Sequence, residues 1–522
     1  ITRAFHEPPP ELLAALDRLP PAEDEPQVDV AREASPDESF RLRRFLRPYR
    51  APLAVGFALV AFDAVLVLLG PLLVRHGIDD GVQAADERAL WAASLAFLAA
   101  ALADWVVTRA YTLVTGRTAE RLLYALRVRV FGHLQRLSLD YYDRELGGRI
   151  MTRMTTDVEA LQQLLQTGLV TAIVSLATCV GVFVFLVVLS PPLALAASSV
   201  LPPLLVATWW YRRRSGAVYA TARDRIATVN ANFQESLSGV RVSQAYTRER
   251  HNITDFRGVN GGYLDARLGA QRLIALYFPF VLLLSDVGTA VVLGVGSALV
   301  AGGSATPGLV IAFVLYLNLF FSPIQQLSQV FDTWQQAVAS MDRIDELMAT
   351  PTGTPAPAHP VRPGRLRGEL RFEGVRFRYP NTVGDEALAG VDLTVHAGET
   401  VALVGATGAG KSTIVKLVAR FYDPVSGRVR VDGHDLRDLD LAAFRQQLGV
   451  VPQEAFLFTG TIRDNIAYGR PDATDAEVEA AARAVGAHAF VSRLAGGYLA
   501  PVSERGRSLS AGQRQLIALA RA

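Results

Sequence analysis

Two long runs of this sequence contain no charged residue, and they limit the fold more than any other feature. The runs cover residues 161–211 and 287–331. A helix of about 20 apolar residues crosses the hydrocarbon core of a bilayer, so each run is long enough for two crossings. Soluble domains bury short apolar helices, whereas runs of this length are typical of chains that span a membrane. The sequence therefore predicts an α-helical polytopic membrane domain.

Breaks and charged segments divide this part of the chain into six predicted crossings. Turn residues at Ser190-Pro191-Pro192 separate the third crossing from the fourth, and those at Gly302-Gly303-Ser304 separate the fifth from the sixth. Arginines gather before the first crossing and at Arg212-Arg213-Arg214. Because such segments stay in the cytoplasm, both termini are expected there. The crossings are expected at 52–74, 90–114, 164–189, 191–211, 273–300 and 308–331.

Two long polar segments, 115–160 and 212–271, are rich in helix-forming residues. We expect them to extend the membrane helices into the cytoplasm. Turns are predicted at Gly147-Gly148 and at Ser238-Gly239, where small flexible residues interrupt the helical pattern.

The N-terminal region has a different composition. Residues 1–36 are acidic and rich in proline, which predicts a disordered extension able to form a short helix at Leu12–Leu19. Arginines alternate with apolar residues across 37–50, as in an amphipathic helix lying on a membrane surface. Because the sequence opens with Ile1 rather than Met, we expect residues to precede it.

Composition excludes two classes of explanation. The formal net charge of +2 gives no indication of nucleic-acid binding. The single cysteine, Cys179, lies in an apolar run, so an intrachain disulfide is ruled out and a packing role is expected.

A glycine-rich segment in the C-terminal part fits the pattern G-x-x-x-x-G-K-[ST], which binds phosphate. Glycines let backbone N–H groups turn inward around phosphate oxygens, and the N-terminus of the following helix adds positive potential. Lys411 is expected to contact the β- and γ-phosphates, and the Ser412 hydroxyl to ligate Mg²⁺. The segment comprises Gly405, Ala406, Thr407, Gly408, Ala409, Gly410, Lys411, Ser412 and Thr413.

The flanking residues predict an α/β P-loop NTPase domain. Thr400 to Gly405 has the pattern of a buried strand, and a helix is expected from Lys411 to about Tyr422. Alternation at Leu370–Phe372 and Val375–Tyr379 is typical of strands. In order, we expect the extension (1–36), the amphipathic helix (37–50), the transmembrane domain (51–348), a Pro/Gly-rich linker (349–368) and the nucleotide-binding domain (369–522).

Three other positions are candidates for nucleotide contact, and each also has an ordinary structural explanation. Tyr379 can be a strand aromatic, and Gln453 can be a loop glutamine. The segment Leu509, Ser510, Ala511, Gly512 and Gln513 opens a helix that runs through Ala522. Ser510 there can be a simple N-cap, although such a helix start is also a ready anion site. Physical chemistry alone leaves these alternatives open.

The order of these motifs decides among them. From about residue 40 onward the chain resembles an exporter-type half-transporter of the ATP-binding cassette (ABC) family, with six membrane helices ahead of one nucleotide-binding domain. The resemblance implies that Tyr379 stacks on adenine and that Gln453 senses Mg²⁺. It implies that residues 509–513 bind the γ-phosphate of ATP held by a partner subunit. It also implies that segments 142–157 and 235–246 carry short helices that contact the cassettes.

Two features depart from the family pattern. Ala511 stands where the family usually has glycine, and we expect a modest effect because alanine is small. The family places its second acidic strand, its catalytic glutamate and its switch histidine beyond Ala522. No catalytic residue is therefore expected within this sequence, and a protein ending at Ala522 is expected to hydrolyse ATP no faster than background.

The implied activity is that of an ABC-type translocase ATPase that uses ATP and Mg²⁺. It would export a hydrophobic or amphipathic drug, lipid or peptide across the cytoplasmic membrane of a bacterium. The implied partners are the bilayer and a second half-transporter, in a homodimer or a heterodimer. An importer of the same architecture and an ATP-regulated membrane protein without active transport are the alternatives.

Ionisable residues within the predicted crossings are candidates for contact with the transported substrate. Asp63 and Asp286 lie near mid-span, where they can line a cavity for cationic or amphipathic cargo or can pair within the protein. Asp104 and Arg109 lie nearer the cytoplasmic end of their helix, and for Arg109 we favour pairing or a water-filled vestibule.

Overall fold

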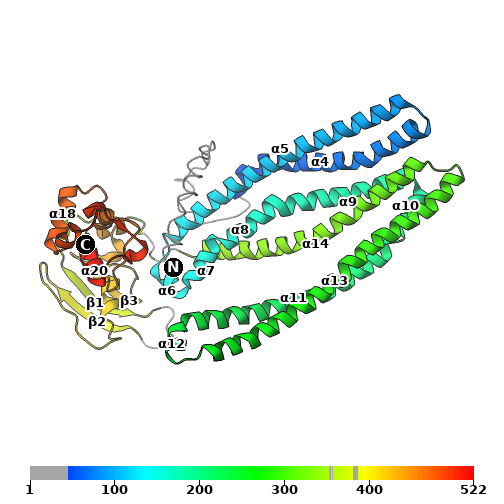
Figure 1. Cartoon of the computed structure of the whole chain (residues 1–522). Coiled ribbons are helices and arrows are strands. Elements are labelled where there is room, and N and C mark those ends of the chain that lie inside the picture. The colour runs from blue at the N-terminus through cyan, green and yellow to red at the C-terminus, as the bar shows by residue number, and fades with distance from the viewer. Residues whose placement is uncertain (1–44, 352–353, 355–356, 380–385) are drawn as a thin grey trace. The chain divides into compact units, whose positions relative to one another are not determined.

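The computed structural model describes residues 45–351, 354, 357–379 and 386–522. The predicted extension at 1–36, its helix at Leu12–Leu19 and most of the amphipathic helix at 37–50 lie outside these residues. Internal contacts divide the chain into two compact units, which we describe separately (Figure 1). The first comprises the described part of Ile1–His133 with Met151–Ala349, and the second comprises Leu134–Ile150 with Thr350–Ala522.

Long helices build the first unit. Five spans in the described residues are long and apolar enough to cross a membrane, namely Arg47–Gln83, Glu87–Leu134, Gly147–Leu189, Pro191–Ser238 and Glu249–Ala301. The elements are η1 (Arg47–Tyr49), α4 (Arg50–His76), η2 (Gly77–Gln83), α5 (Glu87–Leu134), α6 (Leu139–Arg144), α7 (Gly147–Met154), α8 (Thr156–Gln163), η3 (Leu164–Gly168), α9 (Leu169–Leu189), α10 (Pro191–Ser198), α11 (Leu201–Ser238), α12 (Val240–Ala245), α13 (Glu249–Ala301) and α14 (Pro307–Ala349); α6 and the start of α7 belong to the second unit.

Several predicted helix boundaries are confirmed. α9 ends at Leu189 just before the predicted break, and α13 ends at Ala301, directly before Gly302. α11 runs without a break from its apolar first part into the predicted polar segment, and it ends at Ser238. The fourth crossing is not one unbroken helix, because α10 ends at Ser198 and α11 restarts at Leu201 with prolines in its first turn. Proline is tolerated there since the first-turn N–H groups have no helical partner.

The sixth predicted crossing lies on α14, which is continuous from Pro307 to Ala349. Within the described residues its apolar stretch covers Pro307–Pro323. A crossing at 308–331 stays a prediction.

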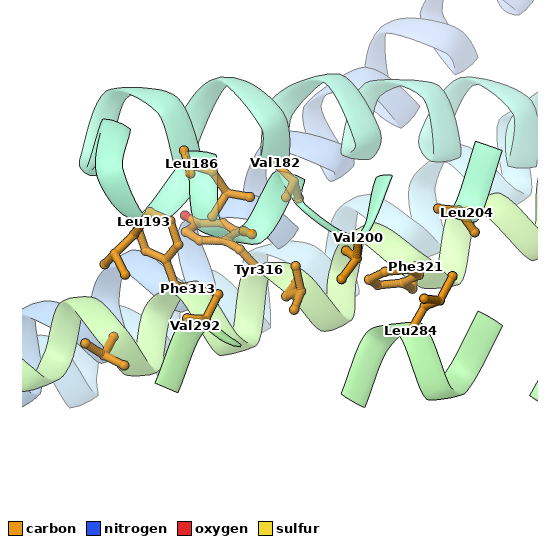
Figure 2. Close-up of a cluster of buried hydrophobic side chains, with 14 of the residues drawn as sticks. Val182, Leu186, Leu193, Val200, Leu204, Leu284, Val292, Phe313, Tyr316 and Phe321 are labelled. Carbon is orange, nitrogen blue, oxygen red and sulfur yellow. The ribbon is translucent and has the colours of Figure 1, made fainter. Parts of the chain in front are cut away.

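A cluster of large buried side chains joins α4, α9, α10, α13 and α14 (Figure 2). The Tyr316 ring of α14 stacks on Phe185 of α9 with 5.7 Å between ring centroids, and its hydroxyl donates to the Leu68 carbonyl of α4 at 2.7 Å. This hydrogen bond satisfies the one polar atom that the tyrosine brings into the cluster. Figure 2 labels Val182, Leu186, Leu193, Val200, Leu204, Leu284, Val292, Phe313, Tyr316 and Phe321.

The second unit contains an antiparallel sheet of strand order β2-β1-β3-β4. Its strands are β1 (Leu370–Phe377), β2 (Leu388–Val395), β3 (Ser426–Val431) and β4 (His434–Asp435). The β1 residues Phe372, Val375 and Phe377 are buried, with a shift in strand register between Phe372 and Val375. Side chains of α15 (Lys411–Val418) and α16 (Leu441–Arg445) are buried with them. The predicted strand pattern around Leu370 is thus confirmed as one strand that ends two residues before Tyr379.

A separate hydrophobic cluster holds the rest of this unit together. Its elements are the pair β5 (Gly460–Thr461) and β6 (Pro501–Val502) with α17 (Ile462–Ile466), η5 (Ala467–Gly469), α18 (Asp475–Ala484), α19 (His488–Val491), η6 (Gly497–Leu499), η7 (Glu504–Gly506) and α20 (Ala511–Arg521).

Two predictions for the second unit are wrong. Residues 400–405 are not a strand, and Val404 is 93% exposed. A strand needs hydrogen-bonded neighbours, and the sheet formed by the described strands holds no partner for this segment. The helix that begins at Lys411 ends at Val418 rather than Tyr422, because Arg420 adopts the left-handed conformation (φ 49°) that interrupts helical hydrogen bonding.

A buried carboxylate ties α8 to α14 in the first unit. Asp157 is 1% exposed and accepts hydrogen bonds from the Ser340 hydroxyl at 2.9 Å and from the Arg343 Nε at 3.0 Å. The charge of Asp157 also raises the pKa of Arg343 above its usual value, mainly through their hydrogen bond. Truncating either partner leaves polar groups unsatisfied.

We expect Asp157→Ala to destabilise the protein by about 1.5–3 kcal/mol, the range for hydrogen bonds to charged groups. The measurement is the melting temperature of detergent-purified protein. Asp342→Ala is the matched control, because Asp342 is an exposed residue of the same helix as Arg343. An equal melting temperature for both variants would contradict the role assigned to Asp157.

Candidate functional site

The glycine-rich segment forms a tight loop that leads directly into α15. The Ala409 N–H donates to the Ala406 carbonyl at 3.2 Å, and Gly408 and Gly410 adopt left-handed conformations with φ of 86° and 84°. A Cβ atom at Gly410 would lie 2.7 Å from the Ala387 carbonyl oxygen. Both the backbone conformation and the close approach therefore require glycine at this position.

Lys411 places its ammonium group over this loop. Its Nζ donates to the carbonyl oxygens of Gly405 at 2.8 Å and of Ala406 at 2.7 Å. The first N–H groups of α15 lack helical partners and point the same way as the positive end of the helix dipole. Ser412 is exposed in this first turn. The loop thus combines free N–H donors, an ammonium group and a hydroxyl, the set that fits a Mg²⁺-bound polyphosphate.

Tyr379 lies beside the same helix. Its hydroxyl is 3.1 Å from the Thr413 hydroxyl, and its ring packs edge-on against Phe377 with 4.9 Å between centroids. The Lys416 ammonium lies 5.1 Å from the centre of the Tyr379 ring. The structure therefore places Tyr379 against α15 beside Thr413, with Lys416 as a cation on its ring, and its contact with nucleotide stays a prediction.

The opposite end of α15 contacts a segment distant in sequence. The buried Tyr422 hydroxyl donates a hydrogen bond to Asp143 of α6. The Lys416 Nζ lies 4.0 Å from the same carboxylate and 5.5 Å from the Tyr422 ring centre. Burial, followed by the hydrogen bond and charge of Asp143, raises the pKa of Tyr422, so its hydroxyl stays protonated and acts as the donor.

The turn after α15 is held by Arg445. This side chain donates to the Ala419 carbonyl at 3.2 Å and to the Arg420 carbonyl at 2.8 Å. Arg420 in turn pairs with Asp423 at 2.9 Å. These contacts stabilise the left-handed residue and fix Tyr422 in position. Sequence reasoning missed this group, because Arg445 lies 26 and 25 positions from the two carbonyl groups that it holds.

The segment 509–513 lies in the other hydrophobic cluster of this unit. Ser510 is the N-cap of α20, and the Gln513 N–H donates to its hydroxyl at 3.2 Å. The Gln513 side chain accepts from the Ser510 N–H at 2.9 Å, which completes a capping box. Leu509 is buried, whereas Ala511 and Gly512 are exposed. The predicted N-cap is confirmed, and two backbone N–H groups of the helix start stand at the surface.

The structure does not join all of the predicted site residues. Gln453 is exposed in an irregular segment. Between described residues, no hydrogen bond connects Gln453 or residues 509–513 to the glycine loop. The phosphate loop and Tyr379 form one group, and the α20 start forms another.

The ionisable residues of the crossings differ in burial. Asp63 of α4 is 6% exposed and accepts a hydrogen bond from the Thr108 hydroxyl of α5 at 2.9 Å. This contact agrees with the alternative in which the acid pairs within the protein. Asp286 of α13 and Arg109 of α5 are exposed.

Comparison with known families explains this combination of a helical unit and a phosphate loop. The model of the ABC transporter transmembrane region matches residues 53–324, and that of the ABC transporter domain matches residues 388–522. This chain belongs to the ABC transporter family. The predicted fold class, a helical membrane domain followed by a P-loop NTPase domain, is confirmed.

Bacterial relatives of this ABC transporter chain cover most of its length. A multidrug efflux ATP-binding/permease protein of Mycobacterium bovis is 46% identical over 92% of the chain. The Bacillus subtilis protein YknV, described as an uncharacterized ABC transporter ATP-binding protein, is 35% identical over 93% of the chain and 80% of its own length. A fatty acid ABC transporter ATP-binding/permease protein of Mycobacterium bovis is 36% identical over 84% of the chain and 68% of its own length. The chain spans only 40% of the length of the multidrug efflux relative.

Because the sequence has just two lysines, amine modification can report on the site directly. We expect inorganic tripolyphosphate with Mg²⁺ to protect Lys411 from acetylation, since the ligand would occupy the loop that the ammonium covers. Lys416, at the other end of the helix, serves as the internal control and should be acetylated at an unchanged rate. Mass spectrometry measures both rates in one sample, and unprotected Lys411 would contradict a phosphate site.

Proposed function

We propose that this chain is one half of an exporter that uses ATP binding and hydrolysis to move a hydrophobic or amphipathic substrate out of a bacterial cell. The observation that carries the proposal is the position of α15. Its N-terminus follows directly on the phosphate loop, while Lys416 near its other end and Tyr422 just beyond that end contact Asp143. Asp143 belongs to the segment that follows the membrane helix α5. A displacement of α15 is therefore transmitted to a segment that leads into the membrane.

Each predicted site residue has a binding role in this proposal. The loop N–H groups and the Lys411 ammonium hold the β- and γ-phosphates, and the Tyr379 ring stacks on adenine. Ser412 and Gln453 supply oxygen ligands for Mg²⁺, which prefers them. Hydrolysis of the bound ATP supplies the free energy. These residues bind and orient the nucleotide, and none is proposed as the base that activates water.

A second half-transporter completes the site. Ser510 and the exposed N–H groups of Ala511 and Gly512 face no phosphate loop among the described residues, although a helix start of this kind favours an anion. In the proposal they bind the γ-phosphate of ATP held by the partner, and the partner's equivalent loop does the same in return. Ala511 adds one methyl group at this contact and is expected to weaken it only modestly.

Export is favoured by the relatives and by the order of the domains. The relatives include a protein described as a multidrug efflux ATP-binding/permease protein, and the membrane region precedes the cassette as in the exporter pattern. In this arrangement both termini and the cassette lie in the cytoplasm. An importer and an ATP-regulated protein without transport remain the alternatives that the following experiment separates.

We expect inside-out vesicles containing the full-length protein to accumulate an amphipathic fluorescent dye when ATP is added. Lys411→Ala should reduce accumulation to the level seen with ADP, because the main cation at the phosphates is lost. ATP-driven loss of preloaded dye from the same inside-out vesicles would indicate import. ATP binding without dye movement in either direction would indicate a regulator.

Because Asp143 contacts α15, we expect its removal to weaken the coupling between ATP use and transport rather than the binding of nucleotide. We expect Asp143→Ala to lower transport about fivefold, equivalent to ~1 kcal/mol, because a half-exposed charged hydrogen bond is weaker than a buried one. ATP affinity should stay within about twofold, since Asp143 does not contact the phosphate loop.

Asp140→Ala is the matched control for this prediction. Asp140 lies on the same short helix but pairs with Arg144 within that helix. A transport defect of equal size in both variants would indicate general damage to α6 and would contradict the specific role of Asp143.

A further inference from the structure

A large cavity in the first unit lies outside every site assigned above. It has a volume of about 1110 Å³ and is lined by residues of α11, α13 and α14. α11 packs along α13, and α13 contacts α14 (Figure 1). The volume is that of a pocket for an organic ligand.

Basic side chains dominate the charged lining of this cavity. Arg212 and Arg223 come from α11 and Arg267 comes from α13, and they share the lining with one carboxylate, Asp332 of α14. None of the three arginines forms an ion pair with another residue in the described part of the chain. Arg212 instead lies over the Phe331 ring at 5.2 Å. Three guanidinium groups beside one carboxylate leave the lining with an excess of positive charge, which favours an anionic ligand.

Aromatic hydroxyl groups accompany these arginines. Tyr211, Tyr219 and Tyr263 line the cavity, and each combines a flat apolar ring with a hydrogen-bonding hydroxyl. The Tyr211 ring stacks on Tyr277 at 4.3 Å, and the Tyr277 hydroxyl is 3.0 Å from that of Thr208, another lining residue. Part of the lining is therefore held in place by packing before any ligand binds.

A second, adjoining cavity extends toward the apolar part of α11. It shares Thr208 and Arg212 with the first cavity and adds Leu205, Trp209 and Arg213, with a volume of about 590 Å³. Leu205 and Trp209 are exposed. A ligand that fills both cavities thus meets arginines and tyrosines at one end and an apolar surface at the other.

The boundary between these two environments lies at the end of the predicted crossing at 191–211. Arg213 lies over the Trp209 ring at 4.9 Å and Arg214 over the Trp210 ring at 5.7 Å, directly after the predicted crossing at 191–211. Tryptophan with arginine is typical of the headgroup region of a bilayer. Basic residues beside a membrane crossing tend to stay in the cytoplasm, and this tendency accounts for Arg213 and Arg214. It does not explain why arginines from two different helices line one cavity.

We propose that the larger cavity binds the acidic head group of an amphiphile, whose hydrocarbon chain lies along Leu205 and Trp209. As a statement about cargo, this inference rests on the function proposed above and specifies its substrate class. It assigns selectivity to arginines at the interface rather than to Asp63 and Asp286. The same chemistry is offered by a single-chain fatty acid and by an acidic phospholipid of the bilayer.

The test is equilibrium binding to the full-length protein in discs of zwitterionic phosphatidylcholine, without nucleotide. Oleate is the acidic probe and oleylamine the basic probe, and empty discs give the background. We expect Arg223→Gln/Arg267→Gln to weaken oleate binding about tenfold through loss of two partly exposed ion pairs. The matched control is Arg225→Gln/Arg272→Gln, which removes one arginine from each of the same helices without touching the cavity. It should bind oleate like the wild type.

A second variant distinguishes the loss of a binding site from misfolding of the protein. Asp332→Asn removes the one carboxylate of the lining and should strengthen oleate binding several-fold, which a damaged protein would not do. Equal binding of oleylamine and oleate, unchanged oleate affinity in the double variant, or no gain from Asp332→Asn would each overturn the proposal.

Two further arms identify the source of the head group. Phosphatidylglycerol added to the discs will displace oleate if the natural occupant is a bilayer lipid, and will not if it is a single-chain acid; an acidic-head-group site stands in both cases. Because binding is measured without ATP, its failure leaves the proposed export function untouched. Failure of ATP-driven dye transport with intact oleate binding would count only against the function.

Discussion

The structure depends on a short helix whose two ends are both fixed. α15 has eight residues, or about 12 Å of length. Left-handed Gly410 ties its start to the phosphate loop, and the turn at Arg420, held by Arg445, ties its end to Tyr422. The Tyr422–Asp143 hydrogen bond joins the turn after this helix directly to α6, without any long pathway of side chains.

Local patterns in the sequence were sufficient for much of this architecture. The long runs without charged residues predicted the membrane helices, and proline and glycine predicted the breaks beside Leu189 and Ala301. The spacing of the glycine-rich motif predicted the phosphate loop. Ser510 was recognised as an N-cap because capping depends on residues three apart. Each of these signals lies within one turn, one helix or one loop, where neighbouring residues decide the conformation.

What could not be predicted depends on distant partners. Tyr422 and Asp143 are separated by 279 positions, and no local pattern indicates that they meet. Residues 400–405 have the composition of a strand, but a strand exists only with neighbours, which sequence pattern does not supply. Asp63 had two open alternatives, and only the position of Thr108 on the next helix decides between them.

The two proposed anion-binding regions differ in the basic residue that they use. Of 52 basic side chains only two are lysine, and both lie on α15. An ammonium is a compact point charge, which suits Lys411 folded over a tight loop and Lys416 among two rings and a carboxylate. Guanidinium groups are planar and weakly hydrated, and they suit an open cavity beside tyrosines and lipid. The two proposals thus assign anion recognition to different chemistry, with backbone N–H groups and lysine for a polyphosphate, and with arginine and aromatic rings for a head group attached to hydrocarbon.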